Sequence, residues 1–219
     1  MSIPQPDRAS LRERAYQRLR RLLVLEQLPA GERLRETEWA ERLEVNRAAL
    51  REAFARLEAE GFLKKGAKTG YFVPDLRAED ILEIIEVRIM LEGGAIERVV
   101  RLGKNNPQEL RLMIEACSQL ERLVHEEYLL GVAEADRRFH EALVNAAGNR
   151  RLAILYERAP LPIIHPLIIT GEQWKTRVQQ TLDEHRAVLE AILDGNVALG
   201  QQLLRTHLDQ RAFVPLYAG

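Results

Sequence analysis

Two residues able to bind a metal ion are predicted to share one buried helix face. In the stretch "EADRRFHEAL", residues 134–143, Asp136 and His140 lie four positions apart, which places them on the same side of a helix. Val132 and Leu143 lie on that side too, so we expect it to face a core. Burying a carboxylate without compensation is costly, so Asp136 needs a partner, and a metal ion is one candidate.

Two later histidines are placed symmetrically about a predicted turn. His185 lies 11 residues before Asn196 and His207 lies 11 residues after it. If the flanking helices fold back as an antiparallel pair, equal arm lengths bring the two imidazoles to the same height. Both helices carry inward aliphatic residues, so both rings are expected to point into the core. The four candidate metal ligands are therefore Asp136, His140, His185 and His207.

Three imidazoles and one carboxylate favour a divalent transition metal over Ca²⁺ or Mg²⁺, because nitrogen ligands suit the transition series. Zn²⁺ is the first choice, with Ni²⁺ and Mn²⁺ as alternatives. The alternative without a metal is that each histidine is a core residue bonded to a backbone carbonyl. The shared register of all four favours the metal. A hydrolase would also need a general base, and Glu141 points about 100° away from His140 around the helix.

The elements that must position these residues are helices. After Asp75 the spacing of apolar residues is helical throughout, without a strand pattern, and Gly, Pro and Asn separate the segments. An all-α antiparallel bundle is the expected fold of this part, with Pro160, Pro162 and Pro166 breaking or bending its fourth helix. The predicted helices span residues 78–102, 107–126, 129–147, 150–169, 173–194 and 197–213.

The N-terminal part reads as a winged helix-turn-helix. Ser10 and Glu13 form a capping-box pattern for a first helix to about residue 26, and a second helix is expected at 36–43. Asn46 is a good N-cap for a third helix that Gly61 ends. The following "FLKKGAKTGYFV" predicts a β-hairpin. We expect a DNA-binding domain at residues 1–75 and a helical effector and metal domain at 76–219.

The third helix has the properties of a DNA-recognition helix. Arg47 and Arg51 lie near its N-terminus, where such helices contact bases, and Arg binds guanine with two hydrogen bonds. Lysines in the hairpin could meet phosphates. The alternative is that both arginines pair with nearby glutamates on a solvated face. The predicted DNA contacts are Thr37, Asn46, Arg47, Arg51, Lys65, Gly66 and Lys68.

Composition sets wider bounds. The formal net charge is −1, but residues 1–75 carry 15 Lys and Arg against 12 Asp and Glu, and the remainder carries an acidic excess. A lone cysteine, Cys117, excludes an intramolecular disulfide, and we interpret it as a core residue in a reducing compartment. The apolar stretches are too short to span a membrane, so a cytoplasmic location is expected. His125 is predicted at the surface, and His165 either borders a pocket or is structural.

The N-terminal segment "LPAGERLRETEWAERLEVNRAALREAFARLEAEGFLKKGAKTGYFV" resembles the winged-helix domain of GntR-family bacterial transcription regulators. The resemblance rests on "AERL", "LREA" and "RLEAEG" at fixed spacings. It departs from the family at Trp39, where a smaller aliphatic residue is usual, at Glu44, where a turn glycine is usual, and at Asn46, where Ser or Thr is usual. Asn caps a helix as well as Ser does. We interpret Trp39 as a packing residue.

The C-terminal part resembles the FCD ligand-binding domain of the FadR subfamily, through "EVRIMLEGGAIE", "DRRFHEALVNAAGN", "EHRAVLEAI" and "THL". The family's metal pattern falls on the four ligands named above, and its members of this type bind small carboxylates over the metal. The resemblance implies that Arg88 lines the effector cavity, whereas Asn149 is either a pocket residue or a helix cap. "PLPIIHPLI", residues 160–168, departs from the family pattern.

Together these patterns predict a homodimeric transcription regulator, by default a repressor, that binds operator DNA and a small organic-acid effector. Two winged helices are needed to read a pseudo-palindromic site. Two alternatives remain open at this stage. In one, the metal ion is itself the signal; in the other, the protein is a metal-dependent hydrolase.

Overall fold

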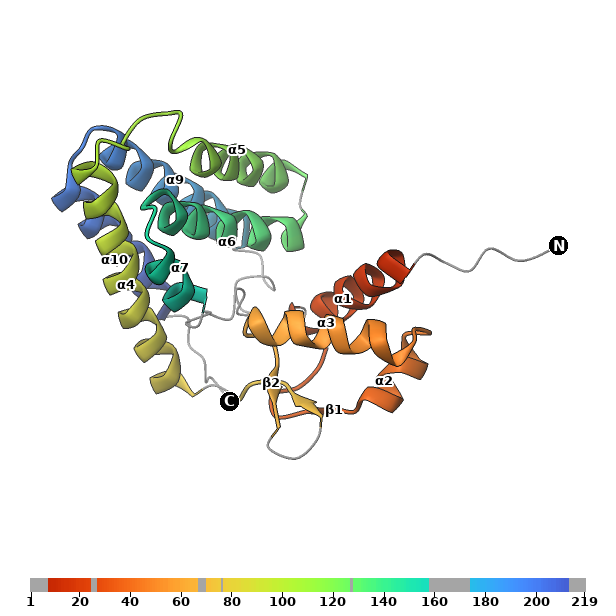
Figure 1. The fold of residues 1–219 in the computed structure, drawn as a ribbon. Helices are drawn as coiled ribbons and strands as arrows, with labels where there is room; N and C mark the ends of the chain where they lie inside the picture. The colour runs from red at the N-terminus through yellow and green to blue at the C-terminus, as the bar shows by residue number, and fades with distance from the viewer. Residues whose placement is uncertain are drawn as a thin grey trace. The chain divides into compact units, whose positions relative to one another are not determined.

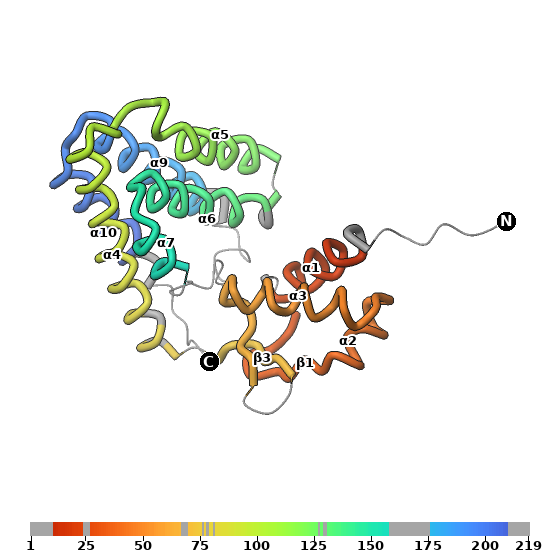
Figure 2. Tube along the Cα trace, in the orientation of Figure 1, coloured from red at the N-terminus to blue at the C-terminus, as the bar shows by residue number. Residues whose placement is uncertain are grey.

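The chain folds into two compact units, Met1–Leu76 and Arg77–Gly219. Figure 1 shows the computed structural model as a ribbon, and Figure 2 follows its Cα trace in the same orientation. The structure describes residues 8–24, 27–66, 70–75, 77–126, 128–157 and 174–212.

The first unit contains three helices and a small sheet. Ser10 lies inside the first helix, so the predicted capping box is wrong. Arg and Ala, which precede Ser10 and favour helix, extend the helix past it. The Glu13 carboxylate instead accepts a hydrogen bond from Gln17 and pairs with Arg56. The helices are α1 (Arg8–Val24), α2 (Glu36–Arg42) and α3 (Arg47–Ala59).

The turn between α2 and α3 is set by two residues. The Asn46 side chain accepts a hydrogen bond of 2.8 Å from the Ala49 N–H, so Asn46 is the N-cap of α3 as predicted. Glu44 adopts a φ of 55°, in the left-handed region. The backbone therefore keeps a glycine-like turn although the residue is glutamate, which costs energy because its Cβ crowds the backbone.

The sheet has three short antiparallel strands in the order β1-β3-β2. The predicted hairpin corresponds to β2 (Lys64–Lys65) and β3 (Tyr71–Phe72). The strand β1 (Arg33–Leu34) was not predicted, because two residues are too few to show an alternating pattern. The tip of the hairpin, including Lys68, lies outside the described residues.

The core of the first unit forms where α1 packs on α3. Leu50, Ala53, Phe54 and Leu57 of α3 are buried. Trp39 of α2 is only 1% exposed, which confirms it as a packing residue. Arg42 covers the Trp39 ring at 4.4 Å from its centroid. The largest core side chains of this unit are Leu19, Leu34, Trp39, Leu50, Phe54 and Leu57.

The second unit is helical throughout its described part. The predicted helix 150–169 is described only as far as Glu157, so Pro160, Pro162, His165 and Pro166 lie outside the described residues. The other predicted helices match within a few residues. Their bounds are α4 (Ala78–Arg101), α5 (Arg111–His125), α6 (Leu129–Ala146), α7 (Arg150–Glu157), α9 (Trp174–Leu193) and α10 (Val197–Ala212).

These helices enclose one hydrophobic core. α4 packs against α6, α7, α9 and α10, while α5 packs against α6 and α9 (Figure 1). Cys117 of α5 is buried in this core, and burial raises the pKa of its thiol to about 11, so a structural role fits. His125 is exposed, as predicted. Among the described residues, no helix is both long and apolar enough to span a membrane.

Candidate metal centre

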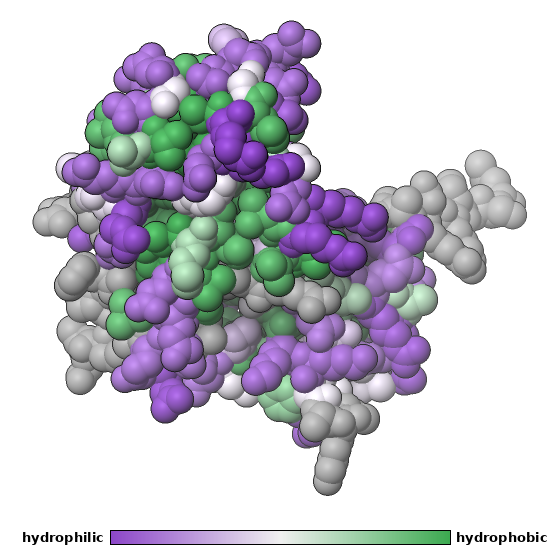
Figure 3. Space-filling view, turned by 60° about the vertical axis from the view of Figure 1, so that its left-hand side comes forward, coloured by the Kyte–Doolittle hydropathy of each residue, from purple (hydrophilic) through white to green (hydrophobic). Residues whose placement is uncertain are grey.

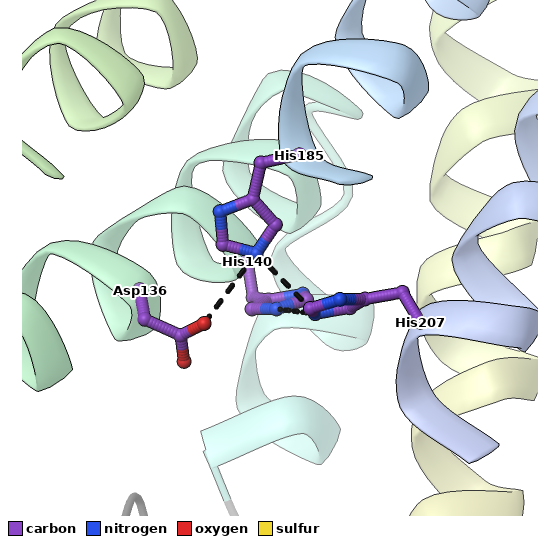
Figure 4. A group of neighbouring side chains, drawn as sticks. All are labelled: Asp136, His140, His185 and His207. Carbon is purple, nitrogen blue, oxygen red and sulfur yellow. Dashed lines mark hydrogen bonds and ion pairs between the residues drawn. The ribbon is translucent and has the colours of Figure 1, made fainter. Parts of the chain in front are cut away.

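The four predicted metal ligands converge at the centre of the helical unit. Asp136 and His140 come from α6, His185 from α9 and His207 from α10 (Figure 4). One potential ligand atom from each residue can be chosen so that all four lie within 4.8 Å of one another. The three imidazoles are almost fully buried, and Asp136 is 6% exposed.

The spacing of these atoms suits a single ion. The His140 and His207 Nε2 atoms lie 3.2 Å apart, and the His185 and His207 Nε2 atoms lie 3.3 Å apart. The His185 Nε2 lies 3.4 Å from Asp136 Oδ1. Ligand atoms about 2.1 Å from a common ion stand roughly 3.0 to 3.4 Å apart when they occupy neighbouring positions. The observed distances match that range.

A buried glutamate fixes the orientation of His140. Glu92 of α4 is fully buried, and its Oε2 lies 2.6 Å from His140 Nδ1. Burial alone would raise the pKa of Glu92, but the Arg88 guanidinium and His140 outweigh it and lower that pKa to about 2. Glu92 is therefore a carboxylate that can only accept, so His140 Nδ1 carries the proton. Nε2, which faces the cluster, is then the nitrogen left to bind a metal.

His207 is held in the same way. Its Nδ1 lies 2.7 Å from Oε2 of Glu184, whose side chain is 22% exposed. A carboxylate accepts this bond, so Nδ1 donates and Nε2 faces the cluster. The Nε2 atoms of His140 and His207, 3.2 Å apart, both face the space where a shared ion would lie. The donor set thus fits a divalent metal ion, and carboxylate-bonded histidines of this kind are typical of metal sites.

Arg88 lies beside the cluster in a buried polar network. Its Nε donates to Glu92 over 2.8 Å and its Nη2 donates to the Tyr156 hydroxyl over 2.7 Å. Burial by itself would lower the pKa of Arg88, but the Glu92 carboxylate and the negative groups nearby raise it above its ordinary value. Burial and Glu92 also raise the pKa of Tyr156, which stays neutral. A permanent cation therefore adjoins the metal ligands.

Three residues that contact the candidate ligands or Arg88 were not predicted from the sequence. Glu92, Glu184 and Tyr156 support the ligands or Arg88, but none stood out in the sequence. Glu92 follows Arg88 by four residues, a spacing that favours an ion pair, so it could have been found. Glu184 and Tyr156 act on residues 23 and 68 positions away, and no local pattern reveals such contacts.

Asn149, the other predicted effector residue, lies at the start of α7. Its side-chain oxygen accepts hydrogen bonds from the backbone N–H groups of Arg151 and Leu152, at 3.1 and 3.3 Å. This is the helix-cap alternative considered from the sequence. Its oxygen is engaged in capping.

Of the predicted DNA contacts, Asn46 caps α3, Arg47 and Arg51 lie in its first turns, and Thr37 lies in α2. Arg47 and Thr37 are exposed. The Arg51 side chain is 65% exposed, and its Nε donates to Glu36 over 2.6 Å, which is the pairing that the alternative interpretation expected. An exposed pair of this kind is weak and can be exchanged for a stronger partner.

The hairpin contributes Lys65, which is exposed, and Gly66. A Cβ added to Gly66 would lie only 2.4 Å from the Phe72 ring, and its N–H donates to the Gly70 carbonyl over 3.0 Å. Gly66 is therefore required by the fold of the turn, whether or not it also meets DNA.

Two family models match the chain. The one described as "Bacterial regulatory proteins, gntR family" matches residues 11–73, and the FCD domain matches residues 83–210. The chain belongs to the GntR family and carries an FCD domain.

Full-length relatives agree with this assignment. The uncharacterized HTH-type regulator YdhC of Bacillus subtilis is 29% identical over 89% of this chain and 86% of its own length. A probable D-xylose utilization operon repressor of Paenarthrobacter nicotinovorans is 26% identical over 87% of this chain and 81% of its own length. These relatives are named as regulators of transcription.

Solved structures share the fold. McbR/YncC of Escherichia coli superimposes with a TM-score of 0.71 at 20% identity, over 92% of this chain and 94% of that one. A transcriptional regulator of Rhodococcus gives 0.63 at 25% identity, over 96% and 99%. This GntR protein is thus a DNA-binding transcriptional regulator and not an enzyme, so the hydrolase alternative is wrong.

Proposed function

We propose that this GntR protein is a repressor controlled by a small organic acid. In the proposal, residues 1–75 bind operator DNA as half of a homodimer, and residues 76–219 bind the acid over a divalent transition metal. Repression as the direction of control is supported by relatives that are themselves named repressors, in Paenarthrobacter nicotinovorans and in Escherichia coli.

The observation that carries the proposal is the pair of imidazoles fixed by buried or half-buried carboxylates. His140 and His207 turn their Nε2 atoms toward each other because Glu92 and Glu184 bind the opposite nitrogens. The proposed ligands are Asp136, His140, His185 and His207. The ion, Zn²⁺ first with Ni²⁺ or Mn²⁺ as alternatives, would supply a Lewis acid for a carboxylate oxygen.

Arg88 supports an anionic effector. It is buried, permanently charged and next to the ligand cluster, and its two described side-chain bonds leave further N–H donors. Arginine donors of this kind form charge-assisted hydrogen bonds to carboxylates. We propose that Arg88 binds the acid group. Asn149 contributes through its amide N–H₂, because its oxygen caps α7.

The observed positions of the described residues are compatible with the DNA-binding role proposed for them from the sequence. Asn46 caps the start of α3. Arg47 and Arg51 lie in the first turns of α3 and Thr37 lies in α2, and all three are exposed. Lys65 lies on the neighbouring hairpin strand. Lys68 remains part of the proposal.

The test is a mobility-shift titration with a duplex selected by the protein from a random pool, at fixed salt. Chelated protein, metal-loaded protein, and metal-loaded protein with each member of an organic-acid panel are compared. We expect one class of acid to weaken DNA binding by about 10-fold or more, and only when metal is present. A response to metal alone would favour the ion as the signal, and an acid response that persists in chelator would contradict the proposal.

A further inference from the structure

One side of α4 is exposed in the described part of its unit. A row of residues spaced three or four apart is exposed along the 24-residue helix, which marks a single face. At its centre, Met90 is 66% exposed and Val87 is 38% exposed. Figure 3 brings forward the side on which α4 lies in Figure 1, and hydrophobic side chains gather there between hydrophilic ones. The row, called here the α4 stripe, consists of Glu83, Val87, Met90, Gly94, Glu97 and Arg101.

The α4 stripe complements itself when it is reversed. Its members are symmetric about position 92, so an antiparallel copy of α4 crossing there would place each residue opposite a fixed counterpart. The counterparts are Met90 with Gly94, Val87 with Glu97, and Glu83 with Arg101.

The central pair fits by shape. A Cβ added to Gly94 would meet nothing within 4 Å, so the missing side chain leaves open space on the exposed face. Glycine in the interior of a helix is unfavourable, and here no contact within the unit requires it. Met90 is long, flexible and apolar, and it would fill the hollow at Gly94 of the other copy. Two-fold symmetry would form this contact twice.

The end pair fits by charge. Glu83 and Arg101 are exposed at opposite ends of the stripe, and neither forms an ion pair with another residue in the described part of the chain. Antiparallel pairing brings them together, whereas parallel pairing would oppose like charges. Glu97 would lay its methylene groups on Val87, and it precedes Arg101 by four residues, the favourable order for a pair within one helix.

We propose that the α4 stripe is the surface on which a second copy of this chain docks, with the two α4 helices antiparallel and crossing between Met90 and Gly94. This inference rests on the homodimer of the proposed function and names its interface. A second copy is a better partner than an unrelated protein, because the shapes and charges along the α4 stripe match those of the same stripe reversed.

The first test is sedimentation equilibrium of the full chain and its Met90→Glu variant. A charge at the centre of the contact is expected to raise the dimer dissociation constant by about 30-fold or more. Leu112→Glu is the matched control, because Leu112 is a 50% exposed leucine on α5. It should leave the dimer unchanged, and circular dichroism verifies that both variants are folded.

The second test exchanges the charges at the ends of the stripe. Glu83→Arg alone and Arg101→Glu alone each create two like-charge contacts in the dimer and should weaken it by about 10-fold. The double variant restores opposite charges and should return the constant to within about 3-fold of wild type. Additive weakening in the double variant would overturn the antiparallel pairing.

The outcomes separate this inference from the proposed function. A wild-type chain that remains monomeric at micromolar concentration would contradict both the proposed dimer and its proposed interface. A wild-type dimer that Met90→Glu leaves intact would retain the dimer of the proposed function and reject the α4 stripe as its interface.

Discussion

Glu92 is the residue on which the protonation of the candidate site depends most. It accepts from His140 Nδ1 and from Arg88, and it is fully buried. In a Glu92→Gln variant the side chain keeps its shape but loses its charge, so it no longer fixes the tautomer of His140. We predict a metal affinity about 10- to 100-fold lower than wild type, measured by competition with a chromophoric chelator.

The control for this prediction is Glu134→Gln on α6. Glu134 pairs with Arg137 and Arg138 on its own helix and not with a metal-ligand candidate in any described contact. The metal affinity of the Glu134→Gln variant should equal that of wild type. Equal affinity of Glu92→Gln and wild type would show that Glu92 does not act on the metal.

The turn before α3 holds Glu44 in a strained backbone conformation. Its φ of 55° costs an L-residue roughly 1 to 2 kcal/mol, and glycine avoids that cost but gains about 0.4 to 1 kcal/mol of unfolded-state freedom. Glu44→Gly should therefore raise the free energy of unfolding of the N-terminal unit by up to about 1 kcal/mol. Urea unfolding measures it, with Glu41→Gly in α2 as a control that should lose stability.

The four ligand candidates could be predicted because three independent registers agree: a four-residue spacing on α6 and two equal distances from one turn. Their supporting carboxylates could not. His140 and Glu92 are 48 residues apart in the chain, and only the packing of α4 on α6 brings them together. Sequence periodicity shows which face is buried, not which buried polar groups meet.

At the scale of elements, we predict that DNA binding depends on α3. In the proposed DNA complex, Arg51 would give up a weak, exposed pair with Glu36 to bind a base or a phosphate. We predict that Arg51→Ala loses about 1 to 3 kcal/mol of specific DNA binding, in a mobility-shift titration at fixed salt.

Arg111→Ala on α5 is the matched control for Arg51→Ala. Arg111 is 64% exposed and pairs with Glu115, so it resembles Arg51 in exposure and pairing but lies in the other unit. It should bind DNA as wild type does. If the two variants bound equally well, Arg51 would have no role in recognition.

Long helices could be predicted closely, whereas one two-residue strand and the start of one helix could not. The periodic segments that became α4, α6, α9 and α10 were predicted within a few residues, because a buried stripe repeats several times in each. The strand β1 has two residues and shows no period. The start of α1 was misplaced because a cap pattern at Ser10 competed with helix-favouring residues before it.

At the scale of the whole molecule, the proposed repressor couples two binding events in two units. If the acid weakens DNA binding by about 10- to 100-fold, linkage requires operator DNA to weaken acid binding by the same factor, a coupling of roughly 1.4 to 2.8 kcal/mol. Calorimetric titration of the acid into metal-loaded protein, with and without operator duplex, measures this. Acid affinities that do not differ, beside a real loss of DNA affinity, would show that the loss does not come from acid bound to the protein.

The central claim is that the helical unit holds a metal ion through the convergent cluster, and metal content measures it most directly. Protein purified without chelator or an affinity tag that binds metal is analysed by elemental mass spectrometry, beside His185→Ala. We predict about one transition-metal ion per wild-type chain and well under half of that in the variant. Wild-type protein without metal after incubation with Zn²⁺, Ni²⁺ and Mn²⁺, or a folded His185→Ala variant with full metal content, would contradict the account.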